Sequence, residues 1–155
     1  MSERTLVLVK PDGVQRLLVG RILARYEERG LKICGLKLVH IDRDLAERHY
    51  AVHREKPFFA GLVEFIVSGP LVALCLEGPN ATSVTRAING ATRPQEAAPG
   101  TVRGDLALET AQNIVHASDS PATAVEELAL WFRAEELLDY EREVDRWVLA
   151  PAGDG

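Results

Sequence analysis

The sequence predicts an α/β protein of the split βαβ type, a sandwich in which helices cover one face of a small sheet. Short apolar runs alternate with amphipathic stretches in the order β-α-β-α-α-β-α-β-α. The predicted strands are few, and the connections between them are long crossovers rather than tight hairpins. A chain of 155 residues fits one domain. We therefore expect a single domain over 1–155, with 140–155 as a C-terminal tail.

The N-terminal part of the chain contains two predicted strands with a helix between them. Residues 5–9 are apolar and rich in β-branched side chains, which is typical of a buried strand, and 10–13 (Lys-Pro-Asp-Gly) indicate a turn. Apolar residues then recur at helical spacing from Leu18 until Gly30, and glycine commonly follows a helix end. Residues 31–40 predict the second strand, with a bulge near its one glycine.

The rest of the chain predicts two more strands, further helices and one long loop. We first expect a helix that is capped by Asp42 or Asp44 and runs through Tyr50, then a helix over 58–68 and a strand over 71–77. A helix capped by Asn80 and ended by Gly90 follows, and then a loop over 91–105. The last elements are a strand ending at His116 and a helix that starts at Pro121 after the cap Ser120.

Composition restricts the function classes. The net charge of −5 argues against a general nucleic-acid binder, which would be basic, but a small nucleotide needs only a few convergent cations. Cys34 and Cys75 lie in apolar runs without zinc-site spacing, so we expect small buried thiols in a reducing compartment. No apolar run approaches the ~20 residues of a membrane span, and no signal-peptide stretch is present. We expect a cytoplasmic protein without a membrane partner.

One histidine has an unusual setting. His116 follows the apolar run Asn113-Ile-Val and precedes the helix start at Ser120-Pro121. A strand-end histidine bonded to a carbonyl is the ordinary explanation for a single such residue. The alternative is a nucleophile, because neutral imidazole attacks phosphorus well near pH 7 and a phospho-enzyme divides one transfer into two. In that case Glu127 or Ser118 would hold the ring.

Phosphate binding would depend on side-chain cations. The chain has no Walker A sequence and no GxGxxG motif. The candidate cations are Lys10, Arg86, Arg93 and Arg103, although each alone would also suit a solvated surface. Mg²⁺ would arrive on the substrate phosphates, so no cage of protein carboxylates is needed.

Seven motifs in a fixed order connect the chain to a known family. They are Leu8-Val-Lys-Pro-Asp-Gly-Val14, His49-Tyr50, Lys56-Pro-Phe-Phe59, Ser68-Gly-Pro70, Gly90-Ala-Thr92, Ala98-Pro-Gly-Thr101 with Arg103-Gly-Asp105, and Asn113-Ile-Val-His-Ala-Ser-Asp-Ser120. With these motifs the chain resembles nucleoside diphosphate kinases over 3–149.

The resemblance implies a fold and a reaction. It implies a ferredoxin-like βαββαβ core, an α+β fold with an antiparallel four-stranded sheet and surrounding helices. It implies a ping-pong kinase in which a nucleoside triphosphate phosphorylates His116 and a nucleoside diphosphate collects the phosphoryl group, with Mg²⁺ as cofactor and low base specificity. It also implies a homo-oligomer, with a hexamer favoured over a tetramer.

The resemblance also assigns roles residue by residue. Tyr50 would lie beside the histidine, and Glu127 and Ser118 would position the imidazole. Lys10 would contact the phosphates and the ribose, Asn113 would contact the ribose hydroxyl, and the phosphates would be held by Arg86, Thr92 and Arg103. Phe58 would stack on the base, and Asp119 would reach Mg²⁺ through water.

Some positions depart from the family pattern or stay outside these roles. Ala117 stands where glycine is commonest, and Thr110 with Ala111 alters the region expected to grip the base. His40, His49 and His53 are interpreted as structural or surface residues. The apolar tail segment 147–149 docks either on its own domain or on another subunit.

Two other function classes stay open at this point. A nucleotide-binding scaffold without turnover would bind ATP but leave the protein unphosphorylated. A nucleic-acid-binding module on a ferredoxin-like sheet would bind single strands with a steep salt dependence, and the acidic charge argues against it.

Overall fold

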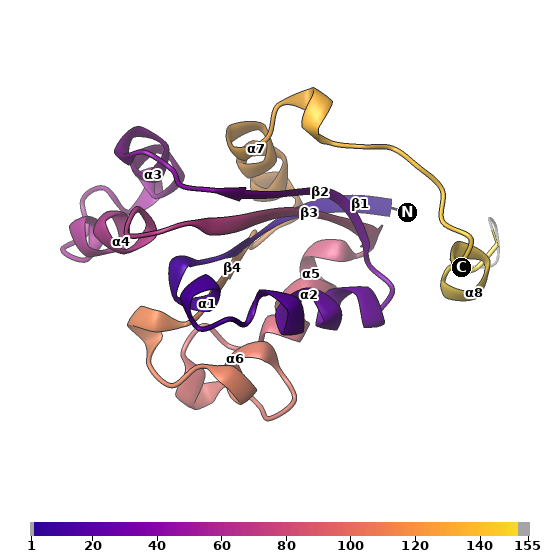
Figure 1. Ribbon diagram of the computed structural model, residues 1–155, viewed down its shortest axis with the longest axis horizontal. Coiled ribbons are helices and arrows are strands. Elements are labelled where there is room, and N and C mark those ends of the chain that lie inside the picture. The colour runs from indigo at the N-terminus through magenta and orange to yellow at the C-terminus, as the bar shows by residue number, and fades with distance from the viewer. Residues whose placement is uncertain (1, 152–155) are drawn as a thin grey trace.

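A four-stranded antiparallel sheet with strand order β2-β3-β1-β4 organises the chain in this computed structural model, which describes residues 2–151 (Figure 1). The strands are β1 (Ser2–Val9), β2 (Lys32–Val39), β3 (Leu71–Pro79) and β4 (Val115–Ala117). The expected antiparallel four-stranded sheet is confirmed. The sheet centre is β1 and β3, which pair from Ser2 opposite Pro79 to Val9 opposite Val72.

Helices cover both faces of the sheet, so the expectation of helices on one face was wrong. The α-helices are α1 (Pro11–Gln15), α2 (Val19–Glu28), α3 (Arg43–His49), α4 (Phe59–Ile66), α5 (Ala81–Asn89), α6 (Val102–Leu106), α7 (Pro121–Trp131) and α8 (Asp145–Val148). One apolar core joins the sheet to α3, α4 and α7, and a second joins it to α2, α5 and α6. Figure 1 shows α3 and α7 above the sheet and α2, α5 and α6 below it.

The sequence of the central strand β1 explains why helices cover both faces. Leu6 and Leu8 belong to the first core, whereas Val7 and Val9 belong to the second, and all four are fully buried. Successive side chains of a strand point to opposite faces. A strand with apolar residues at every position therefore needs a covering layer on each side.

Several local predictions are confirmed. The bulge in β2 lies between Ile33 and Gly35. Gly30 and Gly90 follow α2 and α5 with φ of 101° and 82°, a conformation that glycine adopts without steric cost. The capping alternative is decided for Asp42, whose carboxylate accepts from the Leu45 N–H at 2.9 Å.

Three local predictions were wrong. Residues 10–13 are not a simple turn, because Pro11 occupies the first position of the short helix α1. The expected loop 91–105 contains a 3₁₀ turn over Pro94–Glu96 and the helix α6, which Thr101 caps through the Gly104 N–H. Asn80 does not cap α5 through its side chain. Its φ is 53°, and a carboxylate oxygen of Glu3 accepts from the Thr82 N–H instead.

The tail returns to its own domain along the β2 side. The Tyr140 hydroxyl donates to the Ile33 carbonyl, and Arg142 donates to the Gly30 carbonyl. Val148 packs so closely on Gly30 that an added Cβ would lie 2.6 Å from its methyl carbon. Trp147 nevertheless remains 80% exposed. The final tail residues 152–155, and residue 1 of the expected domain, lie outside the described residues.

Two further expectations concern composition. Cys34 and Cys75 are free and buried, as expected. Across residues 2–151, no helix is long and apolar enough to span a bilayer.

Candidate active site

Strand pairing decides which way His116 faces. His116 lies opposite Leu8 on β1, and directly opposite residues of an antiparallel pair point to the same face. Leu8 belongs to the core under α3, α4 and α7, so the imidazole faces that layer. The strand starts abruptly because Ile114 has φ of 72°, which is strained for a β-branched residue. Asp12 stabilises this turn by accepting from the Ile114 N–H at 3.0 Å.

A carboxylate on α7 orients the imidazole. His116 Nε2 lies 3.1 Å from Oε2 of Glu127, and the Ser118 hydroxyl donates to Oε1 of the same group at 2.6 Å. A carboxylate only accepts, so Nε2 carries the proton and Nδ1 keeps its lone pair. Burial raises the pKa of Glu127, but its hydrogen bonds with His116 and Ser118 outweigh burial and leave the pKa below its usual value. The carboxylate therefore stays charged at neutral pH.

Lys10 and Asn113 meet beside this strand. Lys10 Nζ donates to Oδ1 of Asn113 at 2.5 Å, and the Asn113 amide donates to the Thr92 carbonyl at 2.9 Å. Lys10 is 7% exposed, and burial lowers its pKa to about 8. The sequence placed these three residues in one site, and the structure brings them together.

The two expected phosphate-holding arginines both bond the backbone around β4. Arg103 is buried and donates to the carbonyls of Val115, Gly90 and Asn113 at 2.6, 2.9 and 3.3 Å. Burial lowers its pKa to about 10, and the nearby charge of Arg86 adds to this. Arg86 donates to the Ala117 carbonyl at 3.2 Å. Each arginine therefore places positive charge next to the strand that carries His116.

The remaining expected residues lie around this centre. Tyr50 is buried, and burial followed by the charge of Glu127 raises its pKa to about 12. Phe58 precedes α4 and is 51% exposed, with the His53 ring 5.3 Å away. Asp119 is exposed just after β4. The structure does not bring Arg93 in, because it is exposed and pairs with Glu96 at 3.6 Å.

Sequence reasoning missed His49. Its ring centroid lies 4.5 Å from that of His116 and 4.7 Å from that of Tyr50. The indole N–H of Trp131 donates to its Nδ1 at 3.1 Å. One signal was available, because His49 follows the buried Ala46 by three residues and so lies on the inner face of α3. No sequence signal pairs it with Trp131.

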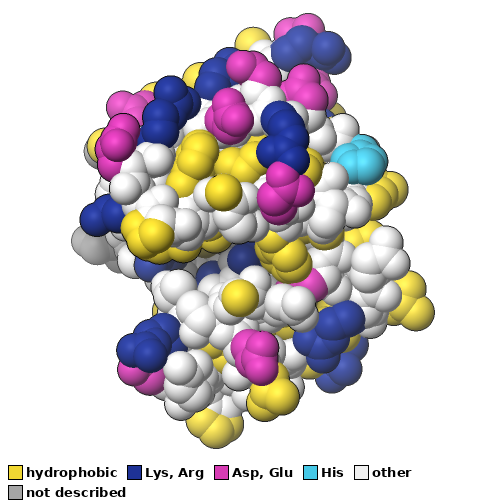
Figure 2. All heavy atoms as spheres, turned by 90° about the vertical axis from the view of Figure 1, so that its left-hand side faces the viewer, with side chains coloured by type: hydrophobic (Ala, Val, Ile, Leu, Met, Phe, Trp, Pro, Cys, Tyr) yellow, Lys and Arg dark blue, Asp and Glu magenta, His cyan; other side chains and the backbone are white. Residues whose placement is uncertain are grey.

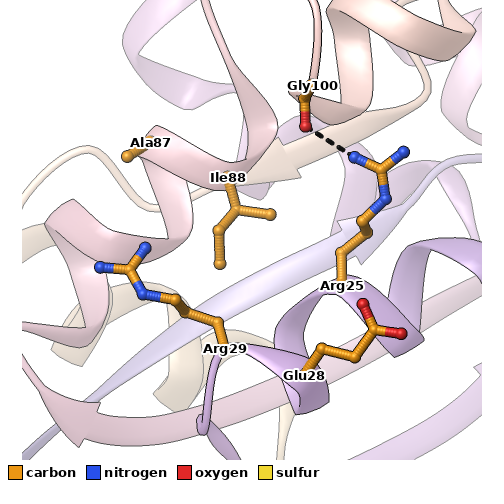
Figure 3. Close-up of a pocket in the computed structure, with 6 residues that line it drawn as sticks. All are labelled: Arg25, Glu28, Arg29, Ala87, Ile88 and Gly100. Carbon is orange, nitrogen blue, oxygen red and sulfur yellow. Dashed lines mark hydrogen bonds between the residues drawn. The ribbon is translucent and has the colours of Figure 1, made fainter.

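One face of the molecule is hollowed. Figure 2 shows the face that carries α3, α4 and α6 with a depression across its middle, and Lys or Arg side chains are visible inside it. A different open hollow lies between α2 and α5 (Figure 3), lined by Arg25, Glu28, Arg29, Ala87, Ile88 and Gly100. Its Arg25 already donates to the Gly100 carbonyl and pairs with Asp105. None of the expected site residues lines this second hollow.

The fold and site define a class of protein. The sheet of this α+β fold carries the imidazole of His116, one nitrogen of which is hydrogen-bonded to the Glu127 carboxylate. The buried cations Lys10 and Arg103 lie beside it. This combination defines a protein that is suited to bind an anionic ligand and to stabilise charge on it. The chain belongs to the nucleoside diphosphate kinase family, because the sequence model described as "Nucleoside diphosphate kinase" matches residues 3–137. It is an enzyme of that family.

Individual relatives cover nearly the whole chain. A nucleoside diphosphate kinase of Thermomicrobium roseum is 56% identical over 147 residues, which covers 95% of this chain and 99% of the relative. The structure of a halophilic nucleoside diphosphate kinase from Halobacterium salinarum in complex with CDP aligns with a TM-score of 0.95 at 49% identity, covering 97% of this chain and all of that one. A family protein from Babesia bovis aligns with a TM-score of 0.92 at 47% identity, covering 94% of this chain and 99% of that one.

Proposed function

We propose that this enzyme transfers the terminal phosphoryl group of a nucleoside triphosphate to a nucleoside diphosphate by a ping-pong mechanism through a phosphohistidine on His116. One observation carries the proposal: Glu127 engages Nε2 of His116, and no hydrogen bond to Nδ1 is found among residues 2–151. The orienting bond therefore leaves a ring nitrogen with a free lone pair, as a nucleophile requires.

The two half-reactions balance on this ring. In the first, the Nδ1 lone pair of His116 forms a bond to the γ-phosphorus, and the bond to the β,γ-bridging oxygen breaks with its electron pair leaving on the nucleoside diphosphate. In the second, a terminal oxygen of an incoming diphosphate attacks the same phosphorus, and the P–N pair returns to Nδ1. The ring gains positive charge during attack, which the charged Glu127 stabilises. Lys10, Arg86 and Arg103 would offset the phosphate charge, and the Thr92 hydroxyl would donate to it.

The residues present suit Mg²⁺ that arrives on the nucleotide. The exposed carboxylate of Asp119, just after β4, would contact the metal ion through water. The one described cluster of possible metal ligands, His49, His116 and Glu127, contains two nitrogen donors, which Mg²⁺ does not favour. When bound, Mg²⁺ would neutralise charge on the transferred group.

The rest of the ligand would be held loosely. Phe58 offers a half-exposed ring at the start of α4, and stacking accepts any base. Asn113 and Lys10 would contact the ribose. Low base specificity follows. We also infer a cytoplasmic location, which the free buried thiols of Cys34 and Cys75 support, and a homo-oligomer, with a hexamer favoured over a tetramer.

A two-step transfer tests the proposal. The protein is incubated with Mg·ATP, freed of nucleotide, and examined by mass spectrometry for an acid-labile phosphate on His116. GDP is then added alone, and GTP is measured. We expect the phosphate to appear and then move to GDP. His116→Ala should abolish both steps, whereas His40→Ala, which removes an exposed histidine bonded to the Val67 carbonyl, should change neither. ATP binding without phosphoprotein would instead indicate a nucleotide-binding scaffold.

A further inference from the structure

His49 is the closest aromatic neighbour of the proposed nucleophile. Its side chain is 1% exposed, and its ring meets the rings of His116, Tyr50 and Trp131 edge to face, with centroids 4.5, 4.7 and 5.4 Å apart. A histidine so enclosed has only a few possible hydrogen-bond partners. Its protonation state is therefore set by the groups that surround it.

Burial keeps the ring neutral, and the hydrogen bond from Trp131 determines which nitrogen carries its proton. An indole N–H only donates, so the Nδ1 atom that it contacts at 3.1 Å must present a lone pair. The neutral ring then has its single proton on Nε2, a buried atom without a hydrogen-bond partner among the described residues. A second proton could enter only at Nδ1, where it would displace the Trp131 bond and leave a buried donor without a partner.

The same nitrogen points toward the carboxylate of Glu127. Nδ1 of His49 lies 3.8 Å from Oε2 of Glu127, while Nε2 of His116 lies 3.1 Å from the same oxygen. If Nδ1 of His49 carried a proton, two imidazoles would compete for one carboxylate oxygen. The Trp131 bond prevents this, and Glu127 remains available to His116 and Ser118.

We propose that His49 is a positioning residue: Trp131 holds it as a neutral Nε2–H imidazole, and this reserves Glu127 for His116. The proposal rests on the proposed function, because it concerns the same transfer. A cation at His49 would oppose the positive charge that develops on His116 during attack. Burial supports the assignment, since it lowers the pKa of His49 to about 3, with a further contribution from His116. The other charged or titratable groups near the ring are Glu127, Lys10 and His53.

The main test frees His49 from its donor. Trp131→Phe keeps an aromatic ring but removes the N–H, so the single proton of His49 can move to Nδ1 and donate to Glu127. We expect the single-turnover rate of His116 phosphorylation by Mg·ATP to fall at least about tenfold, and nitrogen-15 NMR of labelled histidines to show His49 of this variant as the Nδ1–H tautomer. A purely structural role for Trp131 would lower the rate while His49 remains the Nε2–H tautomer.

The double variant Trp131→Phe/His49→Asn is the matched control. Asparagine does not titrate, but its amide could donate to Glu127, so the double variant Trp131→Phe/His49→Phe is the cleaner form of this control. Phenylalanine fills the ring volume and has no N–H, so most of the lost rate should return. Persistence of the full loss in Trp131→Phe/His49→Phe would overturn the proposal. So would a Trp131→Phe rate within about threefold of wild type while His49 carries its proton on Nδ1.

A measurement on the unaltered protein covers the case in which the variants fold poorly. Nitrogen-15 NMR of labelled histidines should show His49 as the Nε2–H tautomer, with shifts that stay constant from pH 5.5 to 8. A His49 that titrates within this range would overturn the proposal even if transfer through His116 proceeds. Failure of wild-type phosphorylation would contradict the proposed function instead, and leaves the tautomer measurement unaffected.

Discussion

Folding shifts the protonation equilibrium of Lys10 in the candidate site. Burial lowers its pKa from the usual 10.5 to about 8, the nearby Asp12 partly opposes this, and the charge of Arg103 adds to it. Between pH 8 and about 10.5 the unfolded chain binds more protons at this residue than the folded chain does. This contribution to the unfolding free energy is therefore unfavourable below about pH 8, and it disappears as the pH rises through the unfolded value.

Nucleotide binding should reverse the shift at Lys10. Phosphate oxygens favour the charged ammonium, so ADP binding at pH 8.5 should take up roughly 0.5–0.8 proton. Titration calorimetry in two buffers of different ionisation enthalpy measures this number directly. In Lys10→Arg the uptake should fall to near zero, since arginine stays protonated throughout this range. Equal uptake in the variant and the wild type would assign the proton to another group.

Sequence reasoning reached single residues unevenly. Lys10, Asn113, Ser118 and Glu127 were expected around His116, and the structure brings them there, because ordered motifs specify them. Sequence reasoning could not place His49 beside His116. Helical spacing shows which face of α3 is buried, but it does not show which residue of another element packs against that face. The strained Ile114 and its partner Asp12 were missed for the same reason.

At the scale of elements, the sequence predicted every strand of the sheet and most helices. Strands such as β1 announce themselves through apolar runs, and α7 through its Ser-Pro start. The short helices α1 and α6 were taken for a turn and a loop, because five residues are too few for a periodic pattern. The continuous apolar run in β1 requires a covering layer on each face, which the expectation of helices on one face did not include.

The starts of α3 and α5 were both expected to be capped by a side chain, but substitutions there should change stability differently. Asp42→Ala removes a side-chain cap and should lower the free energy of unfolding by about 1 kcal/mol. Asn80→Gly removes no cap and relieves a left-handed backbone, so stability should stay the same or rise by up to about 0.5 kcal/mol. Urea unfolding at one fixed protein concentration measures both. A loss of about 1 kcal/mol in Asn80→Gly would mean that its side chain contributes after all.

At the scale of the whole molecule, the tail divides its contacts. Tyr140, Arg142 and Val148 dock on the parent domain, which is the more conservative of the two expectations. Trp147 is left 80% exposed beside them. Val144 and Leu149, close to it in the sequence, are exposed as well, and clustered exposed apolar side chains are typical of an interaction surface. Docking on the chain's own domain therefore accounts for part of the tail. For Trp147, a subunit interface stays a prediction.

Shortening the tail should weaken assembly. We expect a chain ending at Asp139 to give a lower mass than the full chain in light scattering, because it loses Trp147 and the segment that presents it. Trp147→Ala is the sharper variant, since it leaves the contacts of Tyr140 and Arg142 intact. It should lower the mass while retaining the monomer fold by circular dichroism. An unchanged mass in both variants would show that the tail serves only its own domain.

The central position of β1 also has a consequence in time. Ser2–Val9 is the first strand to leave the ribosome, yet its partners are β3, which ends at Pro79, and β4, which ends at Ala117. An apolar strand that is made before its partners must wait, exposed or sheltered by a chaperone, until the residues up to Pro79 have been synthesised. The sheet is complete only when Val115–Ala117 has been added, so His116 reaches its place in the same step that completes the sheet. A nascent chain halted before β4 would therefore have neither a finished sheet nor chemistry.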